Sequence, residues 1–180
     1  MNICVYGAAS NDIDKIYLDE TYKLGAELAK RNIGLVFGAG ANGVMGACAR
    51  GAYSEKGKII GVVPRFFNVD GVRFENCDEM IFTDDMRERK KIMEQRSDAF
   101  IVAPGGIGTF DEFFEILTLQ NLARHKKPIV IFNVNGFYDG LLKFLYETSD
   151  AGFISKKAIE RLIVTENISD IFDLISKFEY

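Results

Sequence analysis

Continuous apolar runs alternate along this chain with segments whose apolar residues recur every three or four positions. The continuous runs predict buried β-strands, and the spaced segments predict helices with one apolar face. Strands are expected at NICVYG, LVF, KIIGVVP, MIFT, FIVA, PIVIFNV and RLIVTE. Helices are expected over residues 12–32, 84–97, 136–152 and 168–178, and after each of two glycine-rich loops. Residues 65–79 are expected to form an irregular loop.

Alternation of strands and helices, with strands that are apolar on both faces, is typical of a parallel sheet covered by helices. We therefore predict the α/β class, with a single doubly wound, mostly parallel, Rossmann-like sheet and helices on both faces. Because no linker or repeat divides the chain, residues 1–180 are expected to form one nucleotide-binding domain. Ligands of such sheets bind at the carboxyl ends of the strands.

The composition narrows the class of partner. A net charge of −4 argues against a nucleic-acid surface. The three cysteines form no CxxC pair, and no His, Asp or Glu cluster has metal-ligand spacing, so neither a disulfide framework nor a metal site is expected. The chain opens on a strand-like segment, and no apolar run is long enough to cross a bilayer. We expect a cytoplasmic protein that does not bind membranes.

The first glycine-rich loop, GAGANG at 38–43, matches the G-x-G-x-x-G pattern of dinucleotide-binding proteins. That pattern belongs after the first strand, whereas this loop follows the second strand. The pattern also needs an acidic residue near the end of the next strand, and that region has Arg65 and no acidic residue. A dinucleotide-dependent oxidoreductase is therefore poorly supported. The loop also resembles a P-loop, but Val44 and Met45 replace the required Lys-Ser/Thr pair, which argues against a nucleoside triphosphatase.

The second glycine-rich loop lies in PGGIGTFDE, residues 104–112, between a predicted strand and a predicted helix. The free amides and positive dipole at a helix N-terminus bind anions. Glycines at such turns can also serve only tight chain reversal. Two glycine loops at one sheet edge favour a phosphate, with Ser10 and Thr109 as possible hydroxyl donors.

Arg89 lies among apolar residues of its predicted helix, since its neighbours three and four positions away are Met86, Ile92 and Met93. An inward guanidinium needs a partner, either a structural carboxylate or an anionic or polar ligand. Glu112 lies one helical turn, roughly 5 Å, beyond the second glycine loop. It can act through the helix dipole alone, or it can face the part of a ligand one sugar-length from a phosphate.

Three motifs together resemble those of the LONELY GUY family. PGGIGTFDE is similar to the PGGxGTxxE motif of that family, MRERK at 86–90 to its companion motif, and FGAGANGVMG at 37–46 to its first glycine loop. The resemblance extends over nearly the whole chain. Members are phosphoribohydrolases that release adenine or an N6-substituted adenine from a nucleoside 5′-monophosphate. Related sequences often carry the label "lysine decarboxylase". Nothing in this sequence supports that activity, because no lysine in a pyridoxal-phosphate setting can be identified.

The resemblance implies a role for each matching position. It makes Arg89 and Glu112 the catalytic pair, and it implies no cofactor and a homodimer. Residues expected to bind the 5′-phosphate are Gly40, Asn42, Gly43, Gly105, Gly106, Gly108 and Thr109. Residues expected near the base and sugar are Met86 and Arg87, to which the helix pattern and the small first loop add Lys90 and Ser10. The chain departs from the family pattern at Ala39, Leu119 and Asn121.

Cleavage of an N-glycosidic bond passes through a cationic sugar, which a carboxylate such as Glu112 stabilises. No general acid for the leaving base stands out, because His125, the only histidine, is expected to cap a helix or to be solvated. Phe66 and Phe67 are candidates for an apolar base pocket. A non-catalytic carrier of a nucleotide or phosphorylated cofactor is the alternative, and both hormone activation and nucleotide salvage fit these residues.

Overall fold

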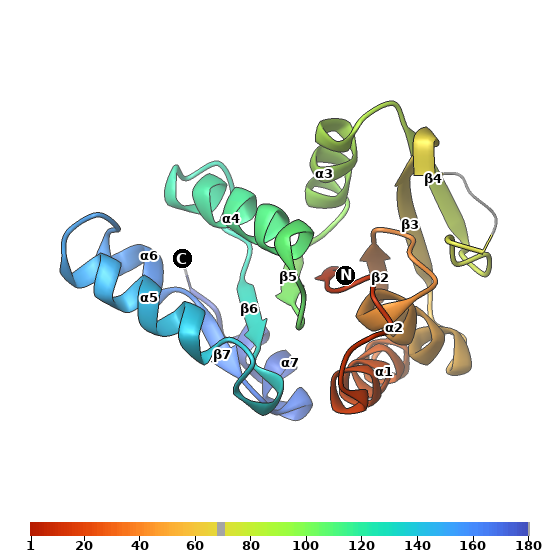
Figure 1. Ribbon diagram of the computed structural model, residues 1–180, viewed down its shortest axis with the longest axis horizontal. Coiled ribbons are helices and arrows are strands. Elements are labelled where there is room, and N and C mark those ends of the chain that lie inside the picture. The colour runs from red at the N-terminus through yellow and green to blue at the C-terminus, as the bar shows by residue number, and fades with distance from the viewer. Residues whose placement is uncertain (68–70, 180) are drawn as a thin grey trace.

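The computed structural model describes residues 1–67 and 71–179. Its strands form one sheet in the order β4-β3-β2-β1-β5-β6-β7, and every pair of neighbouring strands is parallel (Figure 1). The strands are β1 (Asn2–Tyr6), β2 (Gly34–Phe37), β3 (Ile59–Pro64), β4 (Glu79–Thr83), β5 (Ala99–Val102), β6 (Ile129–Phe132) and β7 (Ile163–Thr165). The predicted doubly wound parallel sheet is therefore confirmed.

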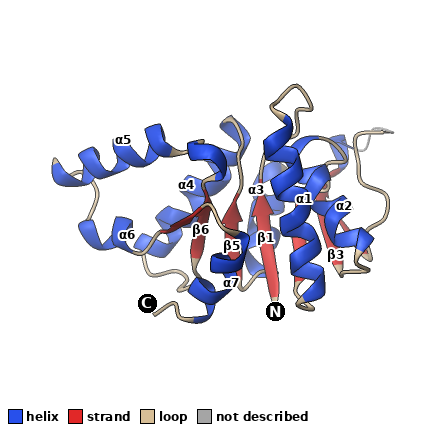
Figure 2. Ribbon diagram, turned by 90° about the horizontal axis from the view of Figure 1, so that it is seen from below, coloured by secondary structure: helices blue, strands red, loops and turns tan. Residues whose placement is uncertain are grey.

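Helices cover both faces of this sheet (Figure 2). They are α1 (Lys15–Lys30), α2 (Gly43–Ser54), α3 (Met86–Gln95), α4 (Ile107–Asn121), α5 (Asp139–Asp150), α6 (Lys156–Glu160) and α7 (Ile168–Ser176), with short 3-10 turns η1 (Arg65–Phe67) and η2 (Val134–Gly136). The short helix α6 has no counterpart among the predicted elements. Among the described residues, no helix combines the length and the apolar character that a bilayer span requires.

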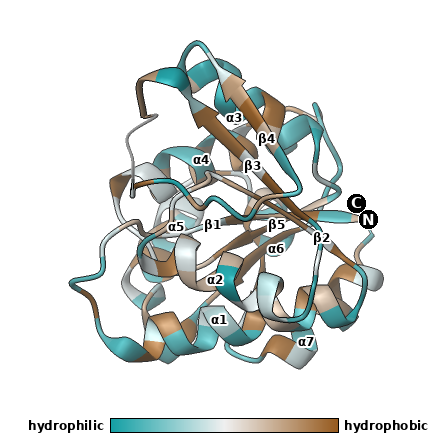
Figure 3. Ribbon diagram, turned by 90° about the vertical axis from the view of Figure 1, so that its right-hand side faces the viewer, coloured by the Kyte–Doolittle hydropathy of each residue, from teal (hydrophilic) through white to brown (hydrophobic). Residues whose placement is uncertain are grey.

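The pleat of each strand divides the core into two layers. Ile3 and Val5 of β1 face a layer that packs under α1, α2 and α7, whereas Cys4 and Tyr6 face a layer under α3, α4, α5 and α6. This alternation is the period of two that a strand imposes on its side chains. Figure 3 shows the result, with hydrophobic residues concentrated on the strands and hydrophilic residues on the outer helices.

Two glycines set the spacing between α1 and α2. A Cβ added at Gly25 would lie 1.9 Å from the carbonyl oxygen of Cys48, and one added at Gly51 would lie 1.9 Å from that of Tyr22. Neither position therefore admits a larger side chain without movement of the helices. The N-terminus of α2 lies beside the loop that follows β1, where the Met45 amide donates to the Ala8 carbonyl oxygen at 3.2 Å.

The chain reverses its winding direction around β1, which lies between β2 and β5. Such a reversal opens a crevice at the carboxyl ends of the two strands involved. The segment expected as an irregular loop, 65–79, begins with η1 and then pairs Arg73 with Gly40 through an antiparallel bridge. Residues 68–70 of that expected loop lie outside the described residues. The bridge brings this segment over the crevice, beside the first glycine loop.

Candidate active site

A cavity of about 430 Å³ lies at the crevice between the loops after β1, β2 and β5. The predicted site residues that line it are Ser10, Gly40, Asn42, Met86, Arg89, Gly106, Gly108, Thr109 and Glu112. Four predicted residues are not among its lining residues, namely Gly43, Arg87, Lys90 and Gly105. The structure thus brings together residues that are up to about a hundred positions apart in the sequence, around one opening.

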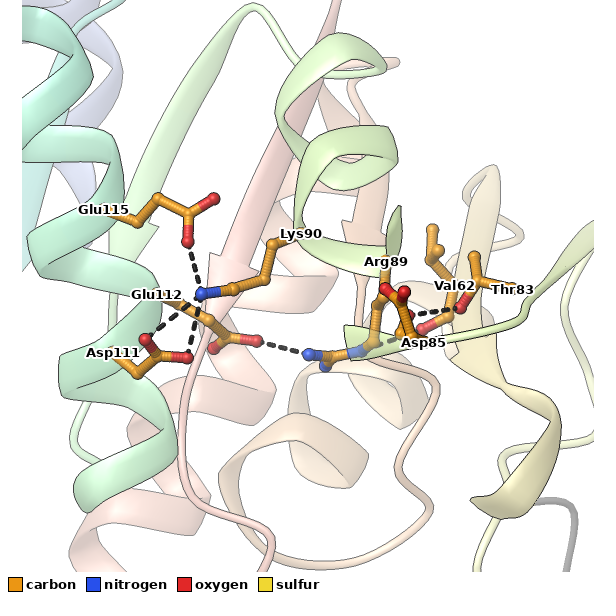
Figure 4. A network of polar contacts seen from close by, with 8 residues as sticks. All are labelled: Val62, Thr83, Asp85, Arg89, Lys90, Asp111, Glu112 and Glu115. Carbon is orange, nitrogen blue, oxygen red and sulfur yellow. Dashed lines mark hydrogen bonds and ion pairs between the residues drawn. The ribbon is translucent and has the colours of Figure 1, made fainter. Parts of the chain in front are cut away.

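The centre of the cavity holds a buried ion pair. The Arg89 Nη1 atom lies 2.7 Å from Glu112 Oε1, and Arg89 Nε donates to the carbonyl oxygen of Val62 at 3.2 Å (Figure 4). Arg89 is 6% exposed and Glu112 is 7% exposed, so water screens the pair little. Two partners were expected for an inward Arg89, a structural carboxylate or a ligand. In the structure Arg89 pairs with a carboxylate and also lines the cavity.

Gly38 makes room for this guanidinium. A Cβ added to Gly38 would lie 1.9 Å from Arg89 Nη2, and any larger residue would displace the arginine. In the sequence this glycine belonged to a nucleotide-binding pattern. In the structure it lines the cavity and its missing side chain is the space that the Arg89 side chain fills.

The protonation of Glu112 reflects two opposing influences. Burial raises the pKa of this carboxyl above its usual value, and the neighbouring Arg89 guanidinium lowers it through charge and hydrogen bonding. Burial is the larger influence, so the pKa is raised. Glu112 is therefore a more basic carboxylate than an exposed glutamate, which suits a group that accepts a proton or faces a developing cation.

A second ion cluster fixes α3 against α4. Lys90 Nζ lies 3.1 Å from the carboxylate of Asp111 and also pairs with Glu115, both on α4 (Figure 4). The Lys90 side chain therefore reaches across from α3 to α4 and is not among the residues that line the cavity. Its neighbour Arg87 is exposed and also lies outside the lining. The sequence placed Lys90 beside the ligand, whereas here it sets the distance between the helices that carry Arg89 and Glu112.

The N-terminus of α4 has the geometry of an anion site. Its N-cap, Gly106, offers no side-chain cap to the first amides of the helix, and Gly106 and Gly108 are exposed toward the cavity. The first amides of a helix have no partner inside it, so they are available to an anion. Gly105 is buried under Thr109, whose Oγ1 would lie 2.1 Å from an added Cβ. Gly105 therefore shapes the turn from inside.

The N-terminus of α2 is occupied by protein atoms. The amide of Gly43 donates to Asn11 Oδ1 at 2.8 Å, and the amide of Met45 donates to the carbonyl oxygen of Ala8 at 3.2 Å. The Asn11 side chain also donates to Asn42 Oδ1 at 3.2 Å. Sequence reasoning missed Asn11, whose only signal was its position one residue after Ser10. This helix end is therefore less open to a phosphate than that of α4.

His125, Phe66 and Phe67 were also discussed from the sequence, and the structure places each of them in a different environment. His125 is buried, its Nε2 pairs with the carbonyl oxygen of Ile116 at 2.9 Å, and its Nδ1 accepts the Lys127 amide at 3.2 Å. Burial lowers its pKa. Of the two expectations for His125, a helix cap or a solvated residue, the solvated residue is wrong, because the ring is buried and bonded to a carbonyl of α4. Phe67 lines the cavity, whereas Phe66 is exposed and does not. Within residues 1–67 and 71–179, no three His, Cys, Asp or Glu side chains are grouped to hold a metal ion.

Ala39 and Asn121, two positions that depart from the family pattern, differ in their distance from the site. Ala39 lines the cavity and has a φ of 60°, a left-handed conformation that favours glycine. Asn121 lies at the far end of α4, where its Oδ1 accepts from the Ser155 hydroxyl at 3.3 Å. Leu119 is also absent from the cavity lining. Only the change at Ala39 therefore reaches the site directly.

The doubly wound sheet with its crevice places the protein in the Rossmann-like class of α/β proteins. A family model described as "Possible lysine decarboxylase" matches residues 45–175. A cytokinin riboside 5′-monophosphate phosphoribohydrolase of Mycobacterium tuberculosis is 43% identical over 93% of this chain and 89% of its own length. A second one, LOG2 of Arabidopsis thaliana, is 34% identical over 98% of this chain and 83% of its own length. The chain belongs to the LONELY GUY family, as its motifs predicted.

The fold also matches that of a solved structure with a different name. The Moco carrier protein of Chlamydomonas reinhardtii superimposes with a TM-score of 0.74, at 24% identity over 98% of this chain and 96% of that chain. At this identity the likeness concerns the fold alone.

The buried pair makes a prediction about stability. In Arg89→Met, Glu112 loses its cation, and we expect the free energy of unfolding at neutral pH to fall by about 3–5 kcal/mol. Burial holds the folded-state pKa of Glu112 above its unfolded value of about 4.3. The folded state therefore binds more protons, so the stability of the variant must decline as pH rises above that value. Urea unfolding across this pH range measures the effect.

The matched control is Arg87→Met, which removes an exposed arginine from the same helix. It should change the free energy of unfolding by no more than about 0.5 kcal/mol. Equal stability of Arg89→Met and the control at neutral pH would show that Glu112 does not depend on Arg89.

Proposed function

We propose that this chain hydrolyses the N-glycosidic bond of adenosine 5′-monophosphate or its N6-substituted derivatives, releasing the free base and ribose 5-phosphate. One observation carries the proposal. The Glu112 carboxylate and the N-terminus of α4 share one cavity, with the carboxylate one helical turn, about 5 Å, beyond the first amides. The relatives named cytokinin riboside 5′-monophosphate phosphoribohydrolase support it.

The 5′-phosphate of the substrate binds at α4, where Gly106, Gly108 and Thr109 line the cavity. The phosphate anchors one end of the ribose, so that C1′ lies against Glu112. The first glycine loop lines the other side of this binding site with Gly40 and Asn42, and Gly43 supports the loop from outside the lining through its bond to Asn11. Ser10 at the end of the β1 loop adds a hydroxyl at the cavity edge.

The reaction breaks the bond between C1′ and the base nitrogen, and its electron pair leaves with the base. The oxygen of one water molecule joins C1′, and one of its protons ends on the released base. The sugar carries positive charge in the transition state, which the Glu112 carboxylate stabilises. The raised pKa of Glu112 also allows it to accept the proton of the water.

Arg89 holds the Glu112 carboxylate in place through the 2.7 Å contact, and its charge opposes the effect of burial on the pKa of Glu112. The base lies toward the apolar part of the lining, which Met86, Phe67, Val63 and Val72 provide. These side chains fit the faces of a purine and offer apolar contact to a substituent on it. Lys90 acts only through the position of α3, by its contacts with Asp111 and Glu115 on α4.

The competing function is a carrier that binds a nucleotide or a phosphorylated cofactor without turnover. The carrier protein with the same fold gives this alternative a structural basis. A carrier has no need of a buried carboxylate held by an arginine beside the sugar, which is why hydrolysis is the better supported function.

Glu112→Gln separates the two functions. It keeps the shape of the side chain and removes its charge, so we expect nucleotide binding to remain and kcat to fall by a factor on the order of 10²–10³ or more. Chromatography of free base and ribose 5-phosphate, after incubation with AMP and N6-isopentenyl-AMP, measures turnover. Calorimetry measures binding.

The control is Asp111→Asn, which removes the adjacent carboxylate that faces Lys90 and is exposed. Because Glu115 still pairs with Lys90, this variant should retain most of the activity. Turnover by Glu112→Gln at the rate of the parent would sink the assignment of Glu112, and tight binding without turnover by the parent would establish the carrier.

We further propose that the protein is a homodimer. Exposed apolar side chains lie on α4 and α5 and directly after these two helices, which cover the same face of the sheet, and they include Ile107, Leu122, Phe144 and Phe153. The two helices can be followed in Figure 1. Exposed apolar groups of this size favour association. Sedimentation equilibrium should give twice the chain mass of 20.2 kDa. Phe144→Asp should halve that mass and Tyr22→Asp, on α1, should not, whereas a monomeric parent protein would refute the dimer.

The proposed partner is a small nucleotide and not nucleic acid, and the proposed location is the cytoplasm. A net charge of −4 disfavours a polyanion, and the thiols of Cys4, Cys48 and Cys77 are free, which matches a reducing compartment. Retention of duplex DNA on a filter, or recovery of the protein outside the cytoplasmic fraction, would contradict these assignments.

A further inference from the structure

The loop between β5 and α4, residues 103–106, has no polar side chain of its own. Its shape therefore depends on what its backbone contacts. The Ala103 amide donates to the Tyr6 carbonyl oxygen at 2.9 Å, and the Pro104 carbonyl oxygen accepts from the Ala8 amide at 3.0 Å. Both contacts attach the loop to the β1 side of the crevice.

Tyr138 holds the same loop from the opposite side. Its hydroxyl donates to the Ala103 carbonyl oxygen at 2.8 Å, across 35 positions of the sequence. The side chain is 1% exposed, and the backbone of Gly105 also hydrogen-bonds to the hydroxyl. One phenol thus contacts the loop on both sides of Pro104. Tyr138 does not line the cavity, so it acts on the loop and not on a ligand.

Tyr138 is itself held firmly. Its amide donates to Asn133 Oδ1 at 2.7 Å, and Asn133 Nδ2 donates to Asp139 Oδ1 at 2.8 Å. The rings of Phe110 and Phe137 pack edge-on against the phenol, with centroids 6.4 and 4.9 Å away. Asn133 directly follows β6. The position of the loop is therefore fixed relative to the sheet through Asn133 and Tyr138.

We propose that Tyr138 is a positioning residue whose hydroxyl, supported by Asn133, fixes the loop at 103–106 so that the first amides of α4 aim at the 5′-phosphate. This inference rests on the proposed function, in that it assumes a phosphate at α4. Without the hydroxyl, the Ala103 carbonyl loses its partner in a buried setting and the loop gains freedom. The phosphate end of the ligand then binds less well, while Glu112 and the base pocket are unchanged.

The test is Tyr138→Phe, compared with Tyr17→Phe. Tyr17 packs edge-on against Phe137, so the control removes a hydroxyl from the same ring cluster without touching the loop. We expect Tyr138→Phe to raise the KM for AMP about tenfold, from the loss of one buried hydrogen bond, with kcat within about twofold. Tyr17→Phe should match the parent in both constants. An unchanged KM, or a fall in kcat alone, overturns the inference.

A second readout is independent of turnover. Calorimetry with ribose 5-phosphate and with adenosine separates the phosphate from the rest of the ligand. Tyr138→Phe should bind ribose 5-phosphate about tenfold more weakly and adenosine as the parent does. Equal losses for both ligands, or no loss, overturn the inference. If the parent binds ribose 5-phosphate in this pattern but releases no base from AMP, the proposed function fails and the inference stands.

Asp139→Ala provides a milder change that does not alter the core. Asp139 is exposed, and its loss frees the Asn133 side chain that supports Tyr138. It should weaken ribose 5-phosphate binding in the same direction by a smaller factor. Unchanged or tighter binding by this variant would contradict the support through Asn133.

Discussion

The ion pair between Arg89 and Glu112 is the interaction on which the rest of the site depends. Neither charge is stable alone at 6% and 7% exposure, so α3 and α4 must approach until the two groups meet. The ion pairs of Lys90 on α3 with Asp111 and Glu115 on α4 favour the same approach. Gly38, directly after β2, leaves space for the guanidinium, and the carbonyl oxygen of Val62 on β3 accepts a hydrogen bond from it.

The topology explains why a carboxylate stands beside a site for an anion. β1 lies between β2 and β5, so the loops that follow these strands converge on one crevice. The α4 helix offers its amides at its first residues and Glu112 one turn later. An extended ligand such as a nucleoside monophosphate has its negative charge and its reacting carbon at a similar separation. In the proposed binding mode, one helix thus contacts both ends of the same ligand.

Most of the fold could be predicted from local patterns in the sequence. Continuously apolar strands predicted the parallel sheet, and the spacing of Met86, Ile92 and Met93 predicted that Arg89 turns inward, which its 6% exposure confirms. These inferences succeed because the periods of strands and helices are properties of neighbouring residues. The position of Glu112 one turn after the second glycine loop had already made it a candidate, and the family motifs then paired it with Arg89. No local pattern could have shown the ion pair itself.

Other features depend on contacts between distant segments, which a single sequence does not display. Gly43 belonged to a pattern for phosphate, but its amide is taken by Asn11 from another loop. Lys90 was placed beside the ligand because it adjoins Arg89, but partners on α4 turn it away. Tyr138 lies in a later strand-to-helix connection and reaches the glycine loop only through the fold.

A crystal structure of the Glu112→Gln variant with AMP tests the central claim most directly. The account predicts phosphate oxygens within about 3.2 Å of the first amides of α4 and C1′ within about 3.5 Å of the side chain at position 112. A phosphate at the N-terminus of α2, or a base in place of the sugar beside position 112, would contradict it.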